Sequence, residues 1–319
     1  MSTNRDKYRA LCSQELRIPL FSQAWWLDAV AGDAWDVALL EQEGVIVASL
    51  PYVTRMRFGL RLIGQPILTP HLGPWLRSGE ARSARRLAKE KNLLQGLYQS
   101  LPAYAQYKQN WYCERNNWLP LYWLGYEQST RYTYRIEQLD DLEAIWSGFD
   151  TNIRTDIRKA EKKFAVKVRT DCSFESFLAL NKKVFDRQSL QVPYSSEVAL
   201  GIHAAAMAQN ACKLFVAVDD QGREHAGVFI LWDSNSAYYL LGGGDPDLRN
   251  SGATSLCMWH AIQFAATVTR KFDFEGSMIE PVERFFRGFG ATQAPYSVIS
   301  KTNSRVIRTL QFIRTIKAG

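Results

Sequence analysis

The order of apolar and polar positions between residues 238 and 301 predicts a strand, a helix, a strand, a helix and a strand. The first strand is an apolar run, Tyr238 to Leu241, which ends in three glycines. The first helix opens at about Ser251. Its apolar positions recur at helical spacing; they are Leu256, Trp259, Ile262 and Ala266.

The second strand is predicted over Phe272 to Glu275, where apolar and acidic residues alternate with the period of a strand. Since side chains alternate between the two faces of a strand, Asp273 and Glu275 are expected on one face. Pro281 suits the first turn of the next helix, and Gly290 suits its end. A last run of β-forming residues, 296–299, predicts the third strand.

The first half of the chain shows weaker patterns. Residues 1–20 are read as a polar lead-in without a defined element. Two apolar runs, Trp35 to Leu40 and Val45 to Val53, predict paired strands joined across Glu43-Gly44. A helix is expected over residues 80–100. We place the boundary between two domains so that they comprise residues 1–136 and 137–319.

The helix expected over residues 151–164 carries two stripes. Its apolar stripe is Ile153, Ile157, Ala160 and Phe164. Its basic stripe is Arg154, Arg158 and Lys162, spaced four residues apart. The basic stripe is either a solvated face or a contact surface for an anionic substrate.

Composition narrows the class of protein. The 319 residues are 46% hydrophobic, which is typical of a globular chain with a sizeable core. The cysteines are scattered without CxxC spacing, and no histidines stand at metal-ligand spacing, so we expect reduced thiols and no metal. The N-terminal residues lack the apolar segment of a signal peptide, and no apolar run reaches membrane-spanning length. These features predict a cytoplasmic protein without an integral membrane segment.

The formal net charge is +7. It is either a bias that favours solubility or the mark of an anionic partner. Such a partner would be the phosphates of CoA, a nucleotide-linked precursor or tRNA; no DNA partner is expected.

Three motifs carry a resemblance to a known family. Arg249-Asn250-Ser251-Gly252-Ala253-Thr254 is similar to the acyl-donor loop of GCN5-related N-acyltransferases (GNAT), Q/R-x-x-G-x-G/A, with Thr254 in place of the last glycine or alanine. The runs 272–277 and 286–290 look like the C-terminal part of FemAB-like acyltransferases, in the branch called BioF2-like. The resemblance covers the second half well and the first half loosely.

The resemblance implies an α/β chain of two tandem GNAT-like units, each a mixed twisted sheet flanked by helices. It implies transfer of an acyl group from acyl-CoA, without a metal, to an amine of a small or sugar-linked acceptor. The alternative donor is aminoacyl-tRNA, with a peptidoglycan or other cell-envelope precursor as acceptor. The residues expected to hold the donor are Arg249, Ser251, Gly252, Ala253 and Thr254, because a helix N-terminus offers free N–H groups to phosphates.

The acids Asp273 and Glu275 are the candidate catalytic residues. They either form a structural ion-pair network with Arg284 and Arg287, or anchor and deprotonate the acceptor amine. The remaining substrate-binding candidates are Arg154, Arg158, Tyr239, Arg284, Arg287 and Lys301.

One departure from the family concerns the proton that the leaving thiolate needs. Many acyl-CoA N-acyltransferases supply it from a tyrosine near the helix after the second strand, but residues 281–291 contain none. Tyr296 or Tyr239 could substitute. The departure also leaves open a third hypothesis, a binding protein on an acyltransferase scaffold that has lost its activity.

Overall fold

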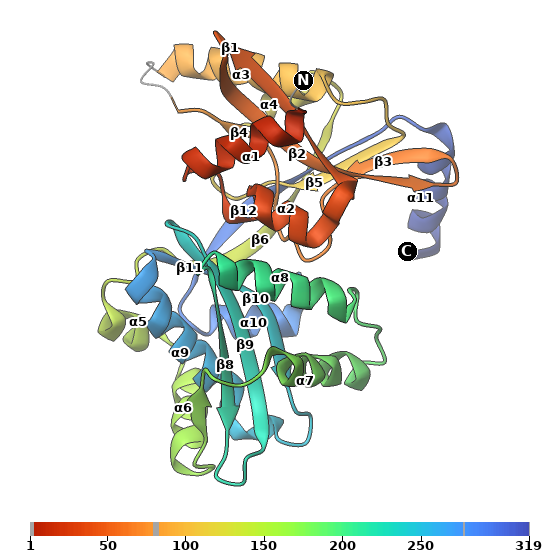
Figure 1. Cartoon of the computed structure of the whole chain (residues 1–319). Coiled ribbons are helices and arrows are strands. Elements are labelled where there is room, and N and C mark those ends of the chain that lie inside the picture. The colour runs from red at the N-terminus through yellow and green to blue at the C-terminus, as the bar shows by residue number, and fades with distance from the viewer. Residues whose placement is uncertain (1–2, 79–82, 277, 319) are drawn as a thin grey trace. The chain divides into compact units, whose positions relative to one another are not determined.

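The computed structural model describes residues 3–78, 83–276 and 278–318 (Figure 1). Its contacts divide the chain into two units: unit 1 is Met1–Arg131 with Pro295–Gly319, and unit 2 is Tyr132–Ala294. The chain enters unit 2 within β6 (Glu127–Ile136) and leaves it within β12 (Thr292–Thr302). The contacts group the last segment with unit 1, and the predicted domains 1–136 and 137–319 stay a prediction.

Unit 1 is built on a mixed sheet. Its neighbouring strands are, in order, β1 (Trp35–Gln42), β2 (Val45–Arg57), β3 (Leu60–Gly64), β5 (Gln106–Asn110) and β12, and β4 (Trp75–Leu76) also pairs with β2. β3 and β5 are parallel, and the other pairs are antiparallel. The predicted hairpin across Glu43-Gly44 is confirmed, and both turn residues have positive φ, as its two-residue loop requires.

The helices of unit 1 are α1 (Asn4–Gln14), α2 (Ala24–Ala31), α3 (Ser83–Gln99), α4 (Leu119–Tyr122) and α11 (Arg305–Ala318). The predicted helix over residues 80–100 is confirmed as α3, although its first expected turn lies outside the described residues. Leu94 and Leu97 of α3 pack into the core with Tyr107 and Trp111.

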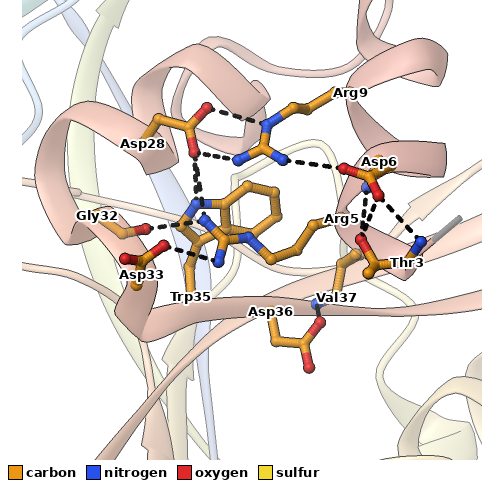
Figure 2. Close-up of polar contacts among 10 residues, drawn as sticks. All are labelled: Thr3, Arg5, Asp6, Arg9, Asp28, Gly32, Asp33, Trp35, Asp36 and Val37. Carbon is orange, nitrogen blue, oxygen red and sulfur yellow. Dashed lines mark hydrogen bonds and ion pairs between the residues drawn. The ribbon is translucent and has the colours of Figure 1, made fainter.

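The prediction that residues 1–20 lack a defined element is wrong, because α1 occupies most of them. Thr3 caps this helix: its side chain accepts a hydrogen bond from the Asp6 backbone N–H, and the Asp6 carboxylate accepts one from Thr3. Arg9 then binds both oxygens of Asp28, at 2.9 and 3.3 Å (Figure 2). The helix is too polar for its periodicity to reveal it, and these contacts fix it instead.

Unit 2 contains mixed strands of its own, flanked by helices. Its strand order is β6, β11 (Lys271–Asp273), β10 (Ser236–Gly244), β9 (Glu224–Trp232), β8 (Cys212–Val218) and β7 (Lys167–Arg169). β10 and β11 are parallel, and the other pairs are antiparallel. The helices are α5 (Leu142–Gly148), α6 (Thr151–Lys162), α7 (Phe174–Arg187), α8 (Ser196–Ala208), α9 (Ala253–Val268) and α10 (Glu280–Arg287).

Helices cover both faces of the unit 2 sheet. On one face, α9 buries Leu256 and Ile262 in a core with Val228 and Ile230 of β9. On the other face, Phe174 of α7 packs edge-on against Phe229 of the same strand, at 4.8 Å between ring centroids. Successive β9 side chains therefore point to opposite helical layers, which confirms the predicted class of a mixed sheet flanked by helices.

None of the helices in the described ranges is long and apolar enough to cross a membrane.

The contact between α7 and β10 yields a stability test. A Cβ at Gly243 would lie 2.8 Å from the Asn181 backbone nitrogen, whereas a Cβ at Gly244 would meet only an ordinary contact at 3.8 Å. We expect Gly243→Ala to lower the free energy of unfolding by about 2 kcal/mol through overpacking. Gly244→Ala, the matched control, should change it by less than about 0.5 kcal/mol. Urea denaturation of the two variants measures the difference, and equal values would contradict the close approach.

Candidate active site in unit 2

The two parallel strands β10 and β11 part at their carboxyl ends. They pair only at Ser236↔Lys271, Ala237↔Phe272 and Tyr238↔Asp273. Beyond Tyr238, β10 continues to Gly244 beside β9 alone, with a register shift between Tyr239 and Leu241. Among the described residues, no strand pairs with the other edge of this segment. Because ligands of open α/β sheets bind outside the carboxyl ends of the strands, this parting is the first candidate feature.

The N-terminus of α9 lies at the same end of the sheet, because α9 connects the end of β10 to the start of β11. The helix has 16 residues, and its N-cap residue, Gly252, has no side chain to cap it. The Ser251 hydroxyl accepts a hydrogen bond from the Ala253 N–H at 3.3 Å, and both residues are buried. The first turn therefore presents the N–H groups of Thr254 and Ser255 at the positive end of the helix dipole, a favourable place for an anion.

Gly252 has a structural task that the motif alone does not reveal. Its φ is +83°, and a Cβ there would lie 2.2 Å from the backbone oxygen of Asp156 in α6. The glycine thus lets the turn before α9 approach the backbone of another helix. Gly252→Val is expected to disturb the fold, so it cannot serve as a clean test of ligand binding. Arg249, in the 3₁₀ turn Arg249–Ser251, is exposed.

Tyr239 lies in β10 directly after the last residue paired with β11. A Cβ on Gly242 would collide with its hydroxyl, so this glycine leaves the space that the phenol occupies. The Tyr239 ring packs edge-on against Phe286 of α10, at 5.8 Å between centroids. Burial raises the pKa of Tyr239 well above its ordinary value, and the neighbouring Cys257 and Tyr194 raise it further. The phenol stays protonated at neutral pH and can donate a proton or a hydrogen bond.

Asn181 of α7 supports the same stretch of β10 from the other face. Its side-chain amide donates to the Gly242 carbonyl, and its oxygen accepts from the Tyr194 hydroxyl at 2.6 Å. The sequence analysis missed Asn181. The signal was present, since an asparagine directly after the buried Leu180 needs a polar partner.

Asp273 ends β11 inside a buried polar network. One carboxylate oxygen accepts hydrogen bonds from the Thr133 hydroxyl and, at 2.8 Å, from the Glu275 N–H. The other lies 3.6 Å from the guanidinium of Arg135 in β6, and both side chains are 5% exposed. The cation beside Asp273 is therefore Arg135, which the sequence analysis did not consider.

The cations expected beside Asp273 lie elsewhere. Arg287 pairs with Glu283 of its own helix at 3.0 Å, and Arg284 is exposed on α10. The Glu283 carboxylate also accepts a hydrogen bond from the Tyr134 hydroxyl. Tyr134 and Arg287 lower the pKa of Glu283, so this group is an anion at neutral pH. Arg284 and Arg287 remain substrate-binding predictions without a described contact to the acids.

Glu275 does not share a strand face with Asp273, because β11 ends at Asp273. Glu275 instead has a φ of +57° and is partly buried. A Cβ on the next residue, Gly276, would lie 2.2 Å from the Tyr132 backbone oxygen, which holds the turn against β6. The strand prediction over 272–275 is wrong in its last two residues, since the Asp273 side chain captures the Glu275 N–H and turns the chain.

The predicted basic stripe does not face the N-terminus of α9. Arg154 donates to the Ser147 carbonyl at 2.9 Å, and the Arg158 guanidinium lies 5.8 Å from the centroid of Trp146. At 100° per residue, both lie on the side of α6 opposite Asp156, the residue that meets Gly252. Lys162, the third member, is exposed.

Lys301 belongs to unit 1. Its ammonium donates to the Leu124 carbonyl at 2.6 Å and lies 5.0 Å from the centroid of Tyr126. Its contacts in unit 1 are structural, and its role in substrate binding stays a prediction.

The buried pair gives a quantitative test. Asp273→Asn removes the buried partner of Arg135 and leaves it the half-exposed Glu137 carboxylate, at 3.5 Å, so we expect a loss of about 3 kcal/mol in the free energy of unfolding, the low end for a broken buried pair. The matched control is Asp171→Asn, which removes one member of the exposed Arg169–Asp171 pair. It should leave the free energy of unfolding nearly unchanged, because both partners are exposed to solvent. A small loss for Asp273→Asn, with catalysis abolished, would instead favour a catalytic role for this carboxylate.

Comparison with known proteins agrees with this architecture. Residues 147–285 match the family model described as "Acetyltransferase (GNAT) domain". No curated protein matches the chain in sequence.

Solved structures share the fold over nearly the whole chain. The crystal structure of FemX is 12% identical, covers 93% of this chain and 96% of its own, and has a TM-score of 0.66. L-PGS from Bacillus licheniformis is 12% identical, with coverages of 92% and 91% and a TM-score of 0.55. A tandem GNAT protein from the clavulanic acid biosynthesis pathway is 10% identical, with coverages of 93% and 93% and a TM-score of 0.54. Residues 147–285 therefore resemble a GNAT acetyltransferase domain, and the chain shares the fold of FemX and of the tandem GNAT protein.

Proposed function

We propose that this protein is an N-acyltransferase that moves an acyl group from acyl-CoA to the amine of a small or sugar-linked acceptor. The observation that carries the proposal is the coincidence of two features at one end of the unit 2 sheet. The N-terminus of α9, where Gly252 brings no capping side chain, offers a place for the diphosphate of the donor. The parting of β10 from β11 leaves, beside it, a stretch of β10 whose outer edge no described strand pairs with.

The chemistry follows from these groups. The thioester carbonyl oxygen would accept hydrogen bonds from the free edge of β10 while the amine attacks the carbonyl carbon. A C–N bond forms and the C–S bond breaks. Tyr239 would give its proton to the leaving thiolate, in place of the tyrosine that α10 lacks. The raised pKa, which keeps the phenol protonated, supports this role. Most of the rate would come from positioning, as in other direct transfers.

Glu275 is our candidate for the acceptor side. It follows β11 at the end where the strands part, and it is partly buried beside the network of Asp273 and Arg135. A carboxylate here would hold the ammonium form of the acceptor and take its proton. Asp273 would position Glu275 through the hydrogen bond to its N–H.

A second candidate donor is aminoacyl-tRNA, with a cell-envelope precursor as acceptor. The observation that favours it is the close contact at Gly252. The Asp156 carbonyl already lies against this glycine, in the loop Arg249–Thr254 that would hold CoA. Thr254 also replaces the small residue of the acyl-CoA motif. Thermal-shift measurements with CoA, acetyl-CoA and aminoacyl-tRNA separate the two donors, because a ligand that binds only the folded state raises Tm.

Thr254→Glu tests the phosphate site without removing the fold. A carboxylate in the first turn stabilises a helix by about 0.3–1 kcal/mol, but it repels an anionic ligand. We expect an unchanged or higher Tm together with a Kd for CoA that is weaker by about tenfold or more, measured by calorimetry. Thr254→Ala is the control and should bind CoA within about threefold of the parent. An unchanged Kd in Thr254→Glu would exclude this site.

Tyr239→Phe and Glu275→Gln separate proton donation from acceptor binding. Tyr239→Phe removes one hydroxyl and should lower kcat by about 10²-fold or more, with the affinity for the donor unchanged. Glu275→Gln should mainly raise the KM for the amine. The measurement is steady-state kinetics with acyl-CoA and a series of amines. Full activity in Tyr239→Phe would show that the thiolate takes its proton from solvent.

A further inference from the structure

An exposed aromatic side chain stands at the tip of the hairpin that joins β2 and β3. Phe58 is 91% exposed. It forms the two-residue turn with Gly59, and both have positive φ, +51° and +71°. Such a turn favours Asn-Gly or Gly-Gly, because a bulky residue in this backbone region is strained. The contact that the chain provides for its ring is the Arg57 guanidinium, 5.4 Å from the ring centroid. Folding would be better served by another residue at this position.

The hairpin around Phe58 is basic and apolar at once. Arg55, Arg57 and Arg61 are exposed, and Met56 is 63% exposed. No acidic residue occurs between Glu43 and Glu80 in the sequence. The tip is therefore an apolar point flanked by positive charge, and none of its three arginines forms an ion pair with another described residue.

The C-terminal helix α11 repeats this combination. Val306, Leu310 and Ile313 stand at helical spacing on one stripe and are 64%, 55% and 43% exposed. Arg305 and Arg308 are exposed on other faces of the helix, and no acidic residue follows Glu283 in the sequence. A helix with an apolar stripe and a basic remainder is typical of segments that lie in a membrane interface.

The β2–β3 hairpin and the segment that leads into α11 both form backbone hydrogen bonds with Ala105 of unit 1. The Ala105 carbonyl accepts hydrogen bonds from the N–H groups of Asn303 and Ser304, which lead into α11, at 2.8 and 3.1 Å. The Ala105 N–H donates to the Arg61 carbonyl of β3 at 2.8 Å. The β2–β3 hairpin and the first residues of α11 therefore lie on the same side of unit 1, where Figure 1 shows β3 beside α11.

We propose that this edge of unit 1, formed by residues 55–61 and 305–313, docks on the surface of an anionic lipid bilayer. Phe58 and Met56 would enter the headgroup region from the hairpin, and the stripe of α11 would lie along it. The arginines would meet lipid phosphates, since each positive side chain near an anionic surface adds to the attraction. A convex tip ringed by arginine suits a fluid charged surface better than a protein groove. This inference does not depend on the proposed transferase activity.

Flotation with lipid vesicles tests the proposal. The full chain should float with vesicles of phosphatidylglycerol and phosphatidylcholine, and much less with pure phosphatidylcholine. Raising the salt from about 0.1 M to about 0.5 M should weaken binding, because exposed charges are then screened over shorter distances. Phe58→Asn combined with Leu310→Ser should lower the partition coefficient by about tenfold or more.

Phe58→Asn also distinguishes lost docking from lost folding. Asparagine suits this turn, so the single variant should melt at the same or a higher temperature while it binds vesicles less. Met207→Ser is the matched control, since Met207 is 56% exposed on α8 of unit 2. Three results would overturn the proposal: no flotation with the anionic vesicles, an equal loss of flotation in Met207→Ser, or a dimer in sedimentation that Phe58→Asn with Leu310→Ser dissolves while vesicle binding is unaffected.

Discussion

The site depends on one constraint, the early end of β11. A parallel neighbour would normally continue beside β10, but the Asp273 carboxylate captures the N–H of Glu275 and turns the chain away after three paired residues. The carboxylate can do this in a buried place because Arg135 and Thr133 compensate its charge. The parting of the strands, the free edge of β10 and the position of Glu275 all follow from this turn.

The glycines of β10 show the same constraint from the other strand. Gly243 lets the backbone of α7 lie against the sheet, and Gly242 leaves room for the Tyr239 hydroxyl. With β11 absent, the Gly242 carbonyl needs another donor, and the Asn181 amide supplies it. The Tyr239 phenol is thereby held beside the part of β10 that β11 does not pair with. Residues 281–291, where many acyl-CoA N-acyltransferases have a tyrosine, contain none.

Periodicity predicted what depends on neighbours in sequence. It identified the stripes of α6 and α9, the hairpin at Glu43-Gly44 and the order of strands and helices around Gly252. It did not predict contacts between residues far apart in the chain. Arg135 lies on β6, remote in sequence from Asp273, and the neighbour of Gly252 is the α6 backbone. Helix α1 was not predicted for the same reason, because its arginines pair with Asp28 only in the folded chain.

Residues other than glycine with a positive φ carry backbone strain, and this strain raises the question of what their side chains contribute. Glu43, Phe58 and Glu275 all have positive φ without being glycine. Glu43 is an exposed polar residue in an ordinary hairpin turn, so a positive φ does not by itself mark a functional side chain. Phe58 is an exposed aromatic in the same kind of turn, and Glu275 is a carboxylate beside a buried ion pair. In both cases glycine or asparagine would relieve strain, and the surroundings of the side chain, more than the strain alone, motivate the roles proposed above. We infer that the proposed bilayer contact accounts for the first side chain, and the proposed acceptor site for the second.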